Sequence, residues 1–100
     1  MIMENSLYTL LMTEDCLVKD ICRYKDAIEI YSGEKERIRD REMGNISDSE
    51  YHNDMARYDR LINSAEYGRD TSENDLKKVR LQIREYIKML MSLDEKGDAQ

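Results

Sequence analysis

The side chains that could perform chemistry are few and scattered. His52 is the one histidine, and Cys16 and Cys22 are the two cysteines. A general base needs a partnered nucleophile or acid, and a zinc site needs several Cys or His ligands at characteristic spacing, so neither site is indicated. The acidic run 94–98 lacks the pattern of a calcium loop, and the four glycines are too far apart to form a phosphate-binding loop. The sequence therefore predicts a non-enzymatic protein without catalytic, cofactor-binding or metal-binding residues.

The two cysteines also bear on the cellular compartment. At about 1.5 Å per residue, their six-residue separation in a helix is about 9 Å along the axis, so they cannot form a disulfide with each other. Two such thiols favour a reducing cytoplasm. The chain starts without the basic residues of a signal peptide, and no apolar run approaches the roughly 18 residues of a membrane span. We therefore expect a cytoplasmic protein with no membrane partner.

The composition favours helices, because the chain has no proline, four glycines and 38% charged residues. A long first helix is expected from Asn5, with a stop at residues 43–45. Its apolar seam can be carried past Gly33 to Ile38, so the helix either continues through Gly33, which we favour, or breaks there and restarts. The residues that define this seam are Leu10, Leu17, Ile21, Tyr24, Ile28 and Tyr31.

Two further helices are expected after this stop. Ser47 and Glu50 have the spacing of a capping box, and the helix that they begin should end near Gly68. The polar residues 69–72 indicate a connection whose Thr or Ser caps a third helix. The second seam is Tyr51, Met55, Tyr58, Ile62 and Ala65, and the third is Leu76, Val79, Ile83, Tyr86 with Ile87, Leu90 and Leu93.

These patterns predict an all-α fold with a long first helix. Short connections place consecutive helices antiparallel, so the chain should form either an elongated three-helix bundle or a helical hairpin. Residues 1–93 form the single helical domain, and residues 94–100, with almost nothing to bury, form a frayed acidic tail.

The first half of the first helix carries apolar residues beyond its seam, which predicts burial on two sides. Tyr8 lies in this region, and its ring with a polar tip suits an interface anchor. We expect the extra surface to pack against a second copy in a homodimer or against another protein's helix. The predicted interface residues are Leu7, Tyr8, Leu11 and Val18.

Two charged stripes flank the seams. They can pair within the bundle or across a dimer, or the basic stripe can bind an acidic partner. Direct nucleic-acid binding is disfavoured because four bases on a chain of net charge −6 release few counterions. The basic stripe is Lys77, Arg80, Arg84 and Lys88, and the acidic stripe is Glu4, Asp15, Asp26 and Glu29.

The leading functional prediction is a small acidic protein that binds another protein through helix-face packing and forms a homodimer. The alternative is an inhibitor whose carboxylates imitate a nucleic-acid backbone and occupy the basic groove of a nucleic-acid enzyme. Such an inhibitor would be of the anti-restriction or anti-CRISPR type carried by phages and mobile elements.

Overall fold

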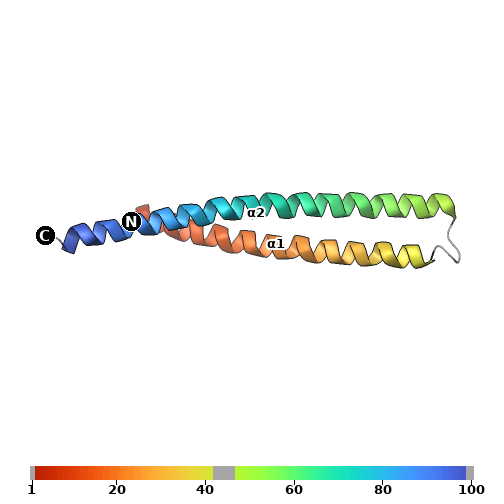
Figure 1. The fold of residues 1–100 in the computed structure, drawn as a ribbon, viewed down its shortest axis with the longest axis horizontal. Coiled ribbons are helices and arrows are strands. Elements are labelled where there is room, and N and C mark those ends of the chain that lie inside the picture. Colours follow the sequence, from red (N-terminus) through yellow and green to blue (C-terminus); the bar gives the residue numbers. More distant parts are fainter. Residues whose placement is uncertain (1, 42–46, 99–100) are drawn as a thin grey trace.

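The chain folds into two long antiparallel helices joined at one end (Figure 1). The computed structural model describes the backbone of residues 2–41 and 47–98, and the side chains of residues 7–40 and 47–93. Helix α1 spans Ile2–Arg41 and helix α2 spans Asp48–Asp98. The rod measures 80 × 17 × 16 Å. We call the end where the helices connect the turn end, and the end where α1 begins the open end.

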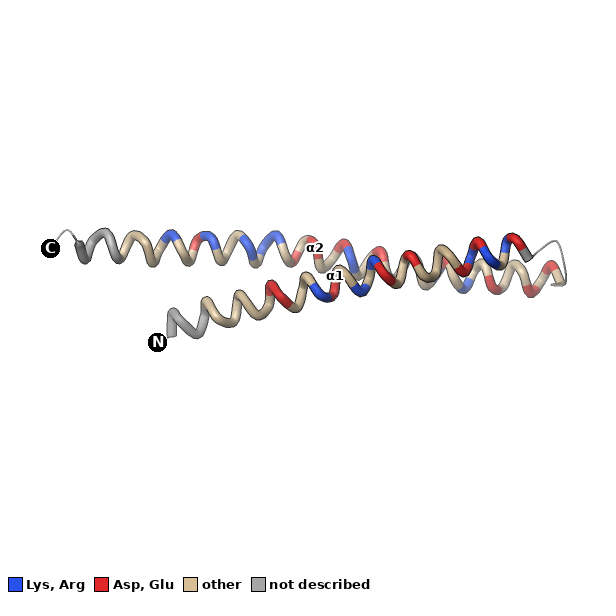
Figure 2. The backbone as a smooth tube through the Cα atoms, turned by 90° about the horizontal axis from the view of Figure 1, so that it is seen from below, with Lys and Arg blue, Asp and Glu red and all other residues tan. Residues whose placement is uncertain are grey.

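The two helices wind around each other as an antiparallel coiled coil. In Figure 1 the helices are seen side by side at the turn end and one behind the other at the open end. Figure 2, turned by 90°, shows the reverse, so the pair twists along the rod. In each helix the least exposed residues recur at alternating steps of three and four, which are positions a and d of a heptad. The seam of α1 is Leu7, Leu10, Glu14, Leu17, Ile21, Tyr24, Ile28, Tyr31, Lys35 and Ile38, and that of α2 is Tyr51, Met55, Tyr58, Ile62, Ala65, Arg69, Ser72, Leu76, Val79, Ile83, Tyr86 and Leu90.

The predicted break between a second and a third helix is wrong, because α2 continues through residues 69–72. The chain is therefore the predicted hairpin and not a three-helix bundle. Ser72 does not cap a helix and instead lies buried in the seam. The spacing of Ala65 and Leu76 carries the missed signal, since eleven residues, taken as steps of four, three and four, preserve the heptad phase.

Gly68 makes room for a ring and does not end the helix. A Cβ atom built at Gly68 would lie 2.5 Å from Cζ of Tyr24, which is shorter than any normal contact. The absence of a side chain therefore lets the Tyr24 ring of α1 lie directly against the backbone of α2.

Two local predictions are confirmed. Helix α1 runs through Gly33, where an added Cβ would meet nothing within 4 Å. Ser47 caps α2, because its Oγ accepts a hydrogen bond of 3.3 Å from the Glu50 amide. The predicted stop at residues 43–45 lies outside the described residues. Helix α2 extends to Asp98, but side chains from residue 94 onward are outside the described part, so the frayed tail stays a prediction.

Charged seam residues help to fix the register of the hairpin. Nε of Arg80 donates to Oε2 of Glu14 at 3.0 Å, and Nζ of Lys35 donates to Oδ1 of Asp59. Both pairs link the helices in the same antiparallel register. A shift by one turn would separate both pairs, so these residues favour a single alignment.

Within the described residues, neither helix contains a segment long and apolar enough to cross a membrane.

Candidate interaction surface

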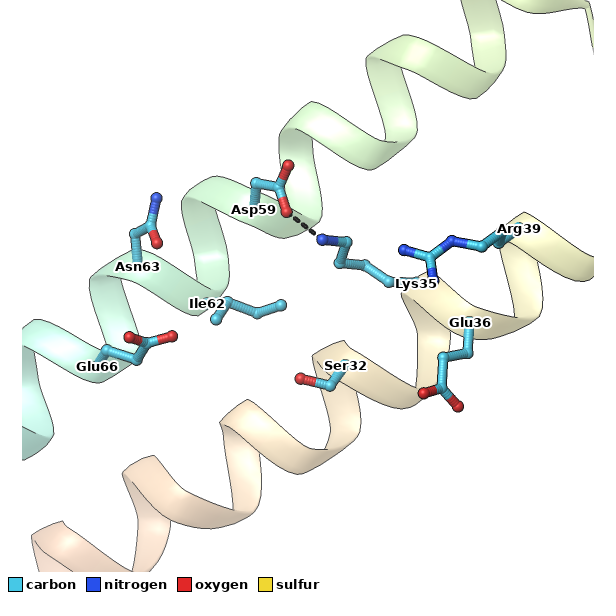
Figure 3. Close-up of a pocket in the computed structure, with 8 residues that line it drawn as sticks. All are labelled: Ser32, Lys35, Glu36, Arg39, Asp59, Ile62, Asn63 and Glu66. Carbon is cyan, nitrogen blue, oxygen red and sulfur yellow. Dashed lines mark hydrogen bonds and ion pairs between the residues drawn. The ribbon is translucent and has the colours of Figure 1, made fainter.

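Positions e and b of both helices face one side of the rod, which we call the e/b side. A shallow groove near the turn end establishes this arrangement, because residues at these positions from both helices line it together (Figure 3). Seam residues Lys35 and Ile62 form its floor, with Lys35 reaching across to Asp59 in the close-up. The flanking residues of the groove are Ser32, Glu36 and Arg39 of α1 and Asp59, Asn63 and Glu66 of α2.

At the open end the same side carries exposed apolar residues among charged ones. Leu11 and Val18 lie three heptads before Ser32 and Arg39, and Ile87 lies three heptads after Glu66. Their relative exposures are 45%, 37% and 44% for Leu11, Val18 and Ile87, in the range that leaves much of each side chain in water. We call this surface the open-end face; its apolar residues are Tyr8, Leu11 and Val18 of α1 and Ile87 and Met91 of α2.

The predicted interface residues divide between the seam and this face. Tyr8, Leu11 and Val18 are exposed on it, whereas Leu7 is half-buried at a seam position. Ile87 was grouped with the third seam, but Tyr86 occupies that seam position and Ile87 lies beside it in the open. Arg80, Arg84, Ile87 and Met91 follow one another at steps of four, three and four, so they lie on one side of α2. This spacing is the sequence signal that α2 contributes to the open-end face.

Most of the basic stripe borders the open-end face. Lys77, Arg80 and Arg84 occupy positions b, e and b of α2, and Lys88 follows at the adjoining position f. Figure 2 shows basic residues gathered in this part of α2. Arg80 pairs with Glu14 of α1, while no ion pair of the other three occurs among the side chains that the structure describes.

The acidic stripe is less continuous. Asp15 lies between Leu11 and Val18 on the open-end face and pairs with Lys19, 2.9 Å away on the same helix. The hydrogen bond and charge of Asp15 raise the pKa of Lys19 above its usual value. Asp26 and Glu29 are exposed farther along α1, and the side chain of Glu4 is outside the described part. Within that part, no hydrogen bond or ion pair joins the acidic stripe to the basic stripe.

The residues considered for chemistry lie apart. His52 is exposed, with its ring 5.5 Å from the Tyr51 ring, and both Cys16 and Cys22 are exposed free thiols. They lie on opposite sides of the hairpin seam, Cys22 at position b and Cys16 at position c. No group of three potential metal ligands comes together among the described side chains.

Comparisons with protein-family models, with curated proteins and with solved structures found no match to this chain.

Proposed function

We propose that this is a cytoplasmic protein that acts by binding another polypeptide through the open-end face, without catalysing a reaction. The observation that carries the proposal is the contrast along the e/b side. Charged and polar residues occupy all six flanking positions of the groove at the turn end. At the open end three of the equivalent heptad positions are the exposed apolar residues Leu11, Val18 and Ile87, while the other three stay charged. Contiguous exposed apolar side chains bordered by charge are typical of protein interaction sites.

The thin interior supports the same proposal. Among the described residues, four hydrophobic side chains are buried: Ile21, Ala65, Leu76 and Val79. Two helices alone cannot cover more than one stripe of each other, so any second apolar stripe stays in water until a partner covers it. The extra apolar residues of α1 form such a stripe together with those of α2.

Charge placement gives no specific support to nucleic-acid mimicry. Acidic and basic residues alternate along much of the rod (Figure 2). Carboxylates such as Asp15 and Glu34 lie against bases of their own helix. A phosphate-like row needs carboxylates without neighbouring cations, so we rank protein binding first.

Site-specific photocrosslinking in cells that express the protein tests this function. A photoreactive amino acid replaces Leu11 on the open-end face, and Met89 serves as the matched control. Met89 is 43% exposed, close to the 45% of Leu11, but occupies position g on the opposite side of the seam. We expect a discrete covalent adduct from position 11 and none from position 89. Equal adducts at both positions, or none at position 11, would overturn the proposal.

A further inference from the structure

The hairpin exposes more surface than a compact chain of its mass. Its accessible surface is 7966 Å², whereas a compact monomer of 11.9 kDa exposes about 5,900 Å². The excess of about 2,000 Å² exceeds the roughly 800 Å² that each partner buries in a standard interface. The elongated hairpin therefore has enough surface for an interface of standard size.

The order of charges on this face points to a second copy of the chain. Asp15 lies on the α1 edge, and Lys77, Arg80 and Arg84 lie on the α2 edge. The pair between Glu14 and Arg80 sets the levels along the rod, so Asp15 is level with the segment from Lys77 to Arg80. At this height the α1 edge of the face carries one acidic residue, Asp15, and the α2 edge carries bases, with apolar residues on both edges.

Such a face is complementary to itself in one orientation. A two-fold axis parallel to the helices places α1 of one copy opposite α2 of the other at the same level, so the acidic edge meets the basic edge. It also brings Tyr8 and Leu11 opposite the part of α2 that carries Arg84 and Ile87. A two-fold axis perpendicular to the helices instead places α2 opposite α2 and brings basic residues together, which repel.

Building on the proposed function, we infer that two copies pack their open-end faces together about a two-fold axis parallel to the rod. The dimer is a four-helix bundle over the open half, and Asp15 of each copy pairs with Lys77 of the other. Tyr8 and Leu11 of α1 then pack against Ile87 of the second copy. Both turn ends, with their charged grooves, then lie at the same end of the four-helix bundle.

Sedimentation equilibrium of the full chain tests the association. We expect a dimer whose dissociation constant rises about 100-fold with Leu11→Lys, because an ammonium group would replace an apolar contact and lie opposite Arg84 of the second copy, and less than about threefold with Met89→Lys. Far-ultraviolet circular dichroism confirms that both variants remain helical. A wild-type chain that stays monomeric at about 100 μM, far above the concentration at which a specific dimer forms, overturns the inference.

A charge exchange tests the orientation. Asp15→Lys should weaken the dimer about tenfold, because the two-fold axis repeats the repulsion against Lys77 of the second copy. Adding Lys77→Glu should return the dissociation constant to within about threefold of the wild-type value, since the pair is restored with reversed sign. Asp26→Lys is the control for net charge alone, because Asp26 occupies position f outside the face. A dimer that Lys77→Glu fails to rescue contradicts the proposed axis.

The crosslinking result separates this inference from the function on which it rests. An adduct of twice the chain mass from position 11 supports self-association. An adduct with a different protein, together with a monomeric wild-type chain, refutes the dimer while leaving the proposed binding function standing. Loss of every adduct at position 11 refutes both.

Discussion

The open half and the turn half of the hairpin share one heptad seam but differ inside and outside. The seam of the open half holds the buried residues Ile21, Leu76 and Val79 as well as the charged Glu14. The seam of the turn half holds the buried Ala65, the charged Lys35 and the tilted ring pair of Tyr31 and Tyr58, with centroids 6.2 Å apart. Outside, the open half presents the open-end face and the turn half a charged groove. The difference teaches that the seam sets the pairing of the helices along the rod, while the flanking positions give its two halves surfaces of different chemistry.

The largest expected effect breaks this comparison in the seam itself. Leu76→Ala in the open half should lower the free energy of unfolding by about 2–4 kcal/mol, because a buried side chain leaves a cavity. Ile62→Ala in the turn half should cost about 1–2 kcal/mol, since Ile62 is only half-buried. Urea unfolding at one protein concentration measures both losses. Equal losses would mean that the two halves are packed alike.

Gly33 and Gly68 should respond to substitution by alanine with opposite signs. Gly68→Ala should lower the free energy of unfolding by about 1–3 kcal/mol, because the new Cβ would overlap the Tyr24 ring. Gly33→Ala in the turn half should raise it by about 0.5–1 kcal/mol, because alanine favours the helix and the added Cβ meets open space.

Thermal unfolding of both variants measures the two signs. Tyr24→Leu in the Gly68→Ala background should reduce the loss relative to that in the wild-type background, since it removes the far end of the ring. A stabilising Gly68→Ala would show that the contact of Tyr24 with the α2 backbone does not constrain this position.

The smallest expected effect concerns a hydroxyl group in the open half. The Tyr86 hydroxyl is buried without a hydrogen-bond partner among the described residues. Tyr86→Phe should therefore raise the free energy of unfolding by about 1 kcal/mol, because it removes a buried polar group that is not satisfied. Tyr67→Phe is the control, since Tyr67 is 75% exposed and should change stability by less than about 0.5 kcal/mol. A loss of stability with Tyr86→Phe would show that the hydroxyl has a partner.

The first helix and its seam were predictable because each turn repeats the same local signal. The steps from Leu10 to Tyr31 satisfy the helical period, and nothing between them stops the helix. Ser47 and Glu50 marked the start of α2 for a similarly local reason, since a cap depends on residues three positions apart. The exposed Tyr8, Leu11 and Val18 followed from the same helical wheel.

The middle of α2 was not predictable from local preference. Gly68 and the polar residues 69–72 have the composition of a helix stop, so local preference predicts two helices here. The structure has one continuous helix instead. Ile87 was likewise placed in the seam because it adjoins Tyr86, although only one of the two can occupy position d. Both differences have the same physical cause. The heptad phase that Ala65 and Leu76 share decides which residues lie in the seam, and it outweighs the local preference of a single residue.

By itself, the sequence determined that this protein is helical, where α2 begins, and which residues of α1 are apolar beyond the seam, because helical period and capping act over a few residues. Only the tertiary structure decided that α2 is continuous and that α1 and α2 contribute to one shared face. A neighbouring helix changes what each position costs: Tyr24 packs into the space left by Gly68, and α1 covers Ser72 within the seam. The contact between Tyr24 and Gly68 joins residues more than forty positions apart, so no local sequence pattern predicts it.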